Sequence, residues 1–125
     1  MSTDRNPVGW FEIYVQDMNR AKAFYEKTFG VTLQKLDAPD VELWAFPMHP
    51  NGSGASGALV KMEGKDSGIG GTLVYFPGDD CATMAERAVQ NGGRLQMPKK
   101  SIGPYGFIAL ILDPEGNMIG LHSIK

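Results

Sequence analysis

Glu12 and His122 are the side chains of this sequence whose types and positions best suit chemistry. Glu12 lies in the alternating stretch GWFEIYV, and His122 lies in the closing stretch MIGLHS. A carboxylic acid and an imidazole on strands that share a cleft can act as an acid and base pair, or as two ligands of a divalent metal. The competing interpretation places Glu12 at the wet end of its strand and makes His122 a surface histidine near the C-terminus.

Other reactive side chains lie in settings that favour ordinary structural roles. His49 occupies the Gly- and Ser-rich stretch MHPNGSGASG. A solvated loop histidine is the simpler expectation there, and contact with a ligand or a third metal ligand is the alternative. Lys99 and Lys100 form a small basic spot that could attract an anionic group, although a solvated lysine pair is simpler. Cys81, without a base partner, is expected to be a small buried helix residue.

Four aromatic side chains are candidates for ligand contact. Trp10 and Tyr14 share one face of a predicted strand, and Trp44 and Phe46 share one face of another. The second pair could line a binding cleft or pack under a helix. Trp10 offers a flat apolar surface with one N–H donor, which suits a planar aromatic or heterocyclic ligand.

The sequence DPEGN at 113–117 is typical of a hairpin turn. Proline stands at the second turn position, and Gly116 supplies a permissive backbone dihedral. The acids are therefore expected to form the turn rather than to bind a metal. The strand that follows has no carboxylate and carries Met118, Gly120 and His122 on one face.

The strands and helices that position these residues are predicted in the same order in each half of the chain. A strand at 9–15 precedes a helix capped by Asp17 and ended by Gly30, and strands follow at 31–36, 41–48 and 58–62. In the second half, a strand at 71–76 precedes the helix of DDCATMAERAVQNGG, and strands follow in RLQMP, GFIALILD and MIGLHS. A shift of about 62 residues places three residues of the first half on three of the second. The pairs are Asp17 with Asp79, Gly30 with Gly92, and Leu59 with Leu121.

This repetition predicts an α+β fold of two tandem βαβββ modules, at about 8–63 and 70–125, within one domain of residues 1–125. Each mixed sheet buries one face under its helix and curves around a cleft with the other. The cleft face is expected to carry Trp10, Glu12 and Tyr14.

Composition narrows the class of partner. With 42% apolar and 21% charged residues, 125 residues can build a hydrophobic core. A net charge of −2 gives no electrostatic footprint for nucleic acid or an anionic membrane, so a small molecule or another protein is expected. The single cysteine, the absence of signal-peptide features in MSTDRNPVGW and the lack of a long apolar run predict a cytoplasmic protein that does not enter membranes.

Three motifs carry a resemblance to a known family. They are V-x-D-M-x-R-A-x-x-F-Y-x-x-x-F-G from Val15 to Gly30, NGG at 91–93, and G-F-x-x-x-x-x-D-P-E-G-N from Gly106 to Asn117. With them, the sequence resembles the vicinal oxygen chelate superfamily, which includes glyoxalases, bleomycin-resistance proteins and extradiol dioxygenases. The resemblance implies the glyoxalase-like fold and a homodimer. It does not imply one reaction, because lyases, isomerases, dioxygenases and metal-free drug binders share this scaffold.

The resemblance also identifies where a metal would be held. Metal-dependent members place a His on the first strand of a module and a Glu on the last, around one divalent ion. These positions fall on Trp10, on Thr72 or Leu73, near Gly57 or Ala58, and on Gly120. None is a usual metal ligand, so no cofactor is expected, and a divalent metal could be held only at an offset site of Glu12 and His122.

Three functions follow as hypotheses. The first is a small-molecule binding protein without the family's usual metal site, which contacts a planar or aromatic ligand through Trp10, Tyr14, Trp44, Phe46 and Gly120. The alternative is a glyoxalase-like lyase or dioxygenase-like enzyme with Glu12 and His122 as acid and base or as metal ligands. The third is a regulatory or interaction module without ligand chemistry.

Overall fold

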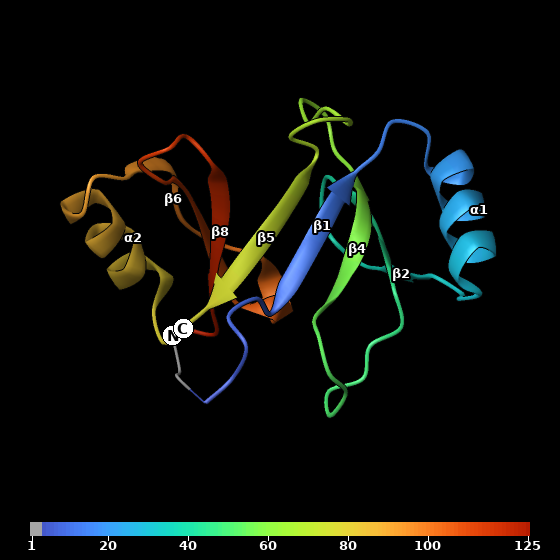
Figure 1. Cartoon of the computed structure of the whole chain (residues 1–125), viewed down its shortest axis with the longest axis horizontal. Coiled ribbons are helices and arrows are strands. Elements are labelled where there is room, and N and C mark those ends of the chain that lie inside the picture. The colour runs from blue at the N-terminus through green and yellow to red at the C-terminus, as the bar shows by residue number, and fades with distance from the viewer. Residues whose placement is uncertain (1–3) are drawn as a thin grey trace. The chain divides into compact units, whose positions relative to one another are not determined.

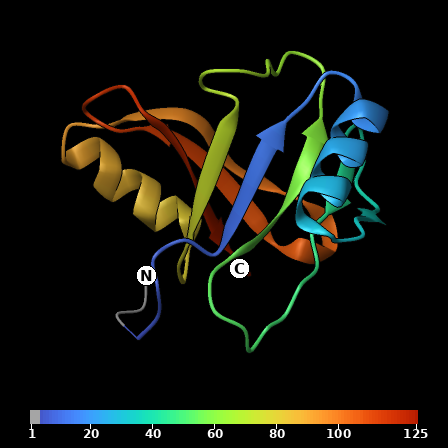
Figure 2. The same ribbon diagram turned by 45° about the vertical axis from the view of Figure 1, so that its right-hand side comes forward.

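The structure, a computed structural model, describes residues 4–125 and has an α+β architecture. Figures 1 and 2 show the course of the chain through its strands and helices. In chain order the elements are β1 (Trp10–Tyr14), α1 (Met18–Phe29), β2 (Gln34–Leu36), β3 (Glu42–Ala45), β4 (Ser56–Lys61), β5 (Thr72–Pro77), α2 (Cys81–Gln90), β6 (Arg94–Ser101), the short 3-10 helix η1 (Gly103–Tyr105), β7 (Phe107–Leu112) and β8 (Met118–Ser123).

The chain divides into two compact units that contain the same strand pattern. One unit comprises residues 10–73, with strand order β2-β3-β4-β1, and the other comprises residues 4–9 and 74–125, with strand order β5-β8-β7-β6. In each unit the first and last strands pair in parallel and the remaining neighbours pair antiparallel. The predicted α+β fold of repeated βαβββ modules is confirmed.

Both helices begin with a capping side chain that the sequence carries, and α1 also ends at its predicted glycine. The side chain of Asp17 accepts a hydrogen bond from the Arg20 amide, and Gly30 ends α1 at a φ of 65°. The second helix is capped by Asp80, whose Oδ1 accepts from the Ala82 amide at 2.9 Å. The alignment of Asp17 with Asp79 is therefore wrong by one residue, because only the residue directly before the first helical turn can cap it.

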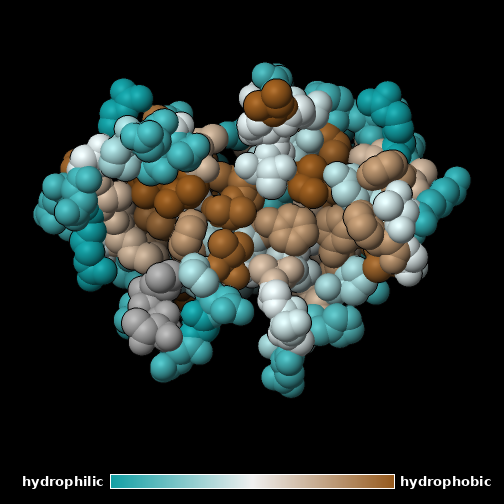
Figure 3. All heavy atoms as spheres, viewed as in Figure 1, coloured by the Kyte–Doolittle hydropathy of each residue, from teal (hydrophilic) through white to brown (hydrophobic). Residues whose placement is uncertain are grey.

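A separate core lies under each helix, and strand parity determines which residues enter it. In the unit of residues 10–73, Val15, Met18, Leu33 and Leu59 form the buried cluster against α1, with Ile13 packed on it. Leu59 is fully buried, which contributes about 1.5–3 kcal/mol for a leucine. In the other unit the buried cluster under α2 consists of Cys81, Ala85, Ala109, Ile111 and Leu121. Figure 3 shows hydrophobic side chains gathered over β8 and β5.

Strand β6 extends past the predicted RLQMP segment, through Pro98, to Ser101. Its register against β7 shifts between Met97 and Lys100, on either side of the proline. Because β6 is an edge strand of its unit, the missing N–H of Pro98 costs no central ladder bond. The basic pair Lys99 and Lys100 therefore lies on a strand rather than in a loop.

Candidate functional site

Glu12 lies between two aromatic hydrogen-bond donors on one face of β1. The indole Nε1–H of Trp10 donates to Glu12 Oε2 at 3.3 Å, and the hydroxyl of Tyr14 donates to Glu12 Oε1 at 2.8 Å. The three residues alternate along β1, so strand geometry places all of them on the same face. We call Trp10, Glu12 and Tyr14 the Glu12 cluster. These two hydrogen bonds fix the direction of the Glu12 carboxylate.

Trp44 and Phe46 lie on the opposite face, against the core under α1. Both pack on the buried cluster that contains Leu59. The Phe46 ring meets the Tyr25 ring edge-on, with centroids 5.7 Å apart. The Lys22 ammonium lies 3.4 Å from the centre of the Trp44 ring. Of the two alternatives, packing under a helix is therefore the observed one, and ligand contact by Trp44 and Phe46 stays a prediction.

Strand register selects between the alternative residues at the positions where the resemblance implies metal ligands. Glu12 pairs with Ala58 on the parallel strands β1 and β4, and Tyr75 pairs with Gly120 on the parallel strands β5 and β8. Ala58 and Gly120 are therefore equivalent, as are the residues two positions before Glu12 and Tyr75. These are Trp10 and Leu73, which selects Leu73 over Thr72 and Ala58 over Gly57. An indole, a methyl, an isobutyl group and a glycine hydrogen supply no ligand for a divalent ion.

Gly120 supplies no carboxylate, and a side chain at this position would have no room. A Cβ built on Gly120 would overlap the ring of Tyr75 and lie 2.8 Å from its Cγ. Tyr75 itself is buried, with 5% of its surface exposed. The family's metal therefore does not fit here, because a glutamate at 120 would need the space that the ring fills. Contact between Gly120 and a ligand stays a prediction.

His122 on β8 forms a hydrogen bond with the last residue of η1, the short helix before β7. Its Nε2 lies 2.6 Å from the carbonyl oxygen of Tyr105, which can only accept, so Nε2 carries the proton of this bond. The other ring nitrogen, Nδ1, then has the lone pair when the imidazole is neutral. His122 and Glu12 belong to different units, so their action as a pair stays a prediction. Residues 4–125 contain no group of three or more His, Cys, Asp or Glu side chains arranged to hold a metal.

The acids of the turn at 113–117 shape the turn. Asp113 Oδ1 accepts from the amides of Glu115 and Asn117, both at 2.9 Å, and Oδ2 accepts from the Asn117 side chain at 3.0 Å. These bonds, above all the one from the Asn117 side chain, lower the pKa of Asp113. The structural function predicted for this turn agrees with these contacts.

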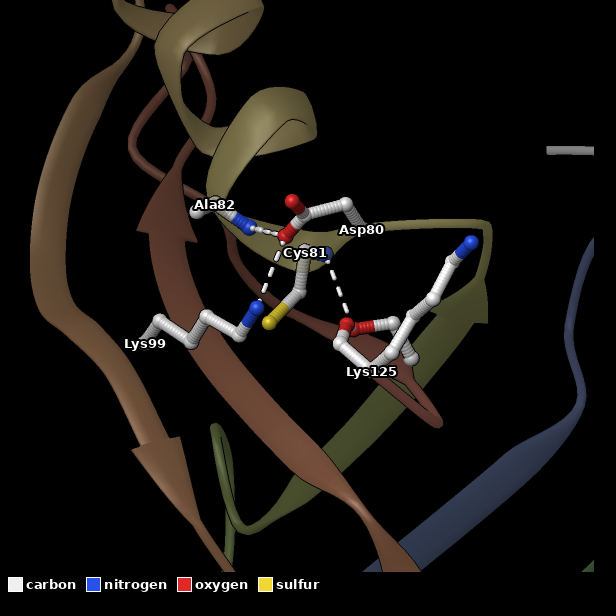
Figure 4. A network of polar contacts seen from close by, with 6 residues as sticks. Asp80, Cys81, Ala82, Lys99 and Lys125 are labelled. Carbon is white, nitrogen blue, oxygen red and sulfur yellow. Dashed lines mark hydrogen bonds and ion pairs between the residues drawn. The ribbon is translucent and has the colours of Figure 1, made fainter.

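Lys99 and Cys81 belong to a network at the start of α2 (Figure 4). The Lys99 ammonium forms an ion pair with Asp80 Oδ1 at 3.0 Å. This bond, followed by the Ala82 amide, lowers the pKa of Asp80. The buried Cys81 donates its amide N–H to the Ser123 hydroxyl at 2.9 Å, as expected for a structural residue. Lys99 therefore forms an ion pair and does not contact solvent alone. His49 is exposed in its loop.

Two surface grooves lie apart from the Glu12 cluster. One, of about 420 Å³, lies between α2 and β6, where Val89 and Leu95 are half exposed. The other, of about 400 Å³, lies at the start of α1 and has a polar lining that includes Asp17, Glu42 and Lys61.

Neither helix in the described part of the chain has the length and apolarity that a membrane span requires.

The sequence pattern already contained the signal for the Glu12 cluster. A spacing of two residues on a strand places Trp10 and Tyr14, each with a hydrogen-bond donor, on either side of the Glu12 carboxylate. No such signal existed for Tyr75, because its contact with Gly120 joins residues 45 positions apart.

Two curated proteins are similar in sequence to this chain. A curated Mycobacterium tuberculosis protein named "Putative glyoxylase CFP32" is 26% identical over 113 residues, which cover 90% of this chain and 43% of that protein. A Mycobacterium bovis protein of the same name matches equally. This chain therefore spans less than half the length of the curated relatives that it matches.

Solved structures show the same fold. Methylmalonyl-CoA epimerase from Mycobacterium tuberculosis has a TM-score of 0.67 and 18% identity, over 95% of this chain and 88% of that one. A variant of the Streptomyces coelicolor epimerase, in complex with 2-nitronate-propionyl-CoA, has a TM-score of 0.69 and 18% identity, over 95% and 97% of the two chains. A hypothetical protein from Bacillus halodurans has a TM-score of 0.71 and 13% identity, over 94% of each chain.

The model of the Glyoxalase/Bleomycin resistance protein/Dioxygenase superfamily matches residues 8–121, nearly the whole sequence. This chain belongs to that superfamily.

Proposed function

We propose that this protein binds a small organic molecule at the Glu12 cluster without the divalent metal that many members of its superfamily use. The observation that carries the proposal is the set of side chains at the metal positions. Trp10, Ala58 and Leu73 offer no ligand, and the ring of Tyr75 fills the space beside Gly120. A scaffold with this set of side chains retains a place for a ligand but not for the ion.

The Glu12 cluster suits a ligand with a flat apolar body and a hydrogen-bond donor. The partly buried Trp10 supplies a planar surface, and the Glu12 carboxylate supplies an acceptor whose direction is fixed by Trp10 and Tyr14. An acceptor that is already oriented loses little freedom when a ligand binds.

Fluorescence titration with N-phenylnaphthylamine, a neutral planar probe, tests this proposal. The wild type is expected to bind the probe saturably, and Trp10→Ala to weaken binding about tenfold, or about 1.4 kcal/mol. Leu95→Gln, in the groove beside α2, is the matched control and should change nothing. The proposal fails if Trp10→Ala binds the probe as the wild type does, whatever the effect of Leu95→Gln. Thermal unfolding of each variant checks that it is folded.

A proton-transfer enzyme is the second candidate, supported by the names of the relatives and by the contact of His122. With Nε2 bound to the Tyr105 carbonyl, Nδ1 can accept a proton from a substrate. Turnover of a carbon acid that is abolished by Glu12→Gln or His122→Gln, while the fold persists, would favour this function over binding alone.

We also propose that the protein is a homodimer. The resemblance to the superfamily implies this state, and the edge strands β2 and β6 present backbone groups that a second copy would cover. Light scattering during size exclusion should give twice the mass of the chain, and a monomer at all concentrations would contradict the proposal.

A further inference from the structure

The connection between β4 and β5 folds back onto the end of β1 that carries Tyr14 (Figure 1). The Tyr14 amide donates to the Gly71 carbonyl at 2.8 Å, and the Gln16 side chain donates to the Lys65 carbonyl at 3.0 Å. A turn within the connection, from the Lys65 amide to the Met62 carbonyl at 3.1 Å, fixes it further. The backbone of Lys65 is thus held beside the Glu12 cluster.

The side chain of Lys65 reaches toward the cluster. Its ammonium lies 5.9 Å from the centre of the Tyr14 ring, at the outer limit of a cation–π contact. Among residues 4–125, no carboxylate forms an ion pair with it, although Glu63 and Asp66 belong to the same connection. Lys65 is also partly buried, so its charge would be screened less than that of a fully exposed lysine.

We propose that Lys65 is the anion-recognising residue of the ligand site at the Glu12 cluster. The natural ligand then carries an oxyanion group, such as a carboxylate or phosphate, on a planar apolar body. This inference rests on the proposed function and specifies the chemical class of its ligand. Trp10 and Tyr14 are four residues apart, which on a strand is about 13 Å. A ligand laid along β1 can therefore contact Trp10 with its flat part and Lys65 with its anion.

Two probes that differ only in charge test the assignment. Anilinonaphthalene sulfonate has the planar body of N-phenylnaphthylamine plus one sulfonate. Replacing Lys65 with methionine keeps the length of the side chain and removes its charge. Lys65→Met should raise the dissociation constant of the sulfonate probe about five- to tenfold and leave that of the neutral probe within about twofold. Lys65→Arg should restore most of the affinity for the sulfonate probe, because it restores the charge.

The outcomes separate the two proposals. Equal weakening of both probes by Lys65→Met, or no effect on either, overturns the assignment of Lys65 while the ligand site stands. If Trp10→Ala leaves the binding of both probes unchanged, the ligand site itself is wrong, and the assignment of Lys65 falls with it. Lys61→Met, at the exposed end of β4, is the matched control and should affect neither probe.

Discussion

The ring of Tyr75 on β5 occupies the space into which a side chain at Gly120 on β8 would extend. The two residues are register partners on parallel strands, and a Cβ at position 120 would overlap the ring. Gly120→Ala should therefore lower the free energy of unfolding by about 1–3 kcal/mol, because the core must absorb an overlap. Urea denaturation followed by tryptophan fluorescence measures this change.

Truncation of the ring should relieve this cost. In a Tyr75→Ala background, Gly120→Ala is expected to cost less than in the wild type, which is a favourable coupling in a double-mutant cycle. Tyr75→Phe is the matched control, because it keeps the ring and should give no relief. Additive costs in the Tyr75→Ala background would show that the ring does not close position 120.

At Gly57, by contrast, an added side chain would clash with a backbone atom as well as with a ring. A Cβ at Gly57 would overlap the carbonyl oxygen of Phe11 as well as the Phe11 ring. Gly57→Ala should therefore destabilise the protein to a similar extent, and Phe11→Ala should not relieve it, because the carbonyl remains. Urea denaturation of the single and double variants checks this prediction. Full rescue by Phe11→Ala would contradict it.

Tyr14→Phe removes the hydroxyl that donates to Glu12. The expected loss is about 1.5–3 kcal/mol in the free energy of unfolding, the usual range for a hydrogen bond to a charged group. Tyr105→Phe is the control, because Tyr105 contributes its backbone carbonyl, not its hydroxyl, to the contact with His122. Equal stability of Tyr14→Phe and wild type in chemical denaturation would show that the hydroxyl does not hold the carboxylate.

The ion pair of Asp80 with Lys99 should make stability depend on acid pH. The pKa of Asp80 is lowered in the folded protein, chiefly by the Lys99 side chain. Its contribution is therefore fully present above the ordinary Asp pKa of about 3.9 and is lost as the pH falls through the lower folded value. Asp80→Asn retains a capping side chain but not the charge. The wild type should melt at a higher temperature than Asp80→Asn at neutral pH, and the difference should shrink in acid. A difference that stays constant with pH would contradict this.

The elements of this fold were predictable because their signals are local. Alternation in GWFEIYV located β1 and placed Ile13 and Val15 on the core side, and Asp17 and Gly30 located the ends of α1. The cap of α2 was placed one residue early, because Asp79 and Asp80 are adjacent and both can cap.

The candidate site was only partly predictable. Composition could not determine on which face of the sheet Trp44 and Phe46 lie, because both faces of a half-buried strand accept aromatic residues. The contacts of Tyr75 with Gly120 and of Lys65 with Tyr14 join residues far apart in the sequence. Such contacts depend on strand pairing and on the course of a connection, neither of which local pattern specifies.

The metal content of the purified protein tests whether its superfamily's metal site has been lost. The purified protein is incubated with Mn, Fe, Ni and Zn, dialysed without chelator and analysed for bound metal. We expect far less than one ion per chain, because the four metal positions hold Trp10, Ala58, Leu73 and Gly120. Retention of about one ion per chain, and its release by Glu12→Ala or His122→Ala, would contradict the account and establish an offset metal site.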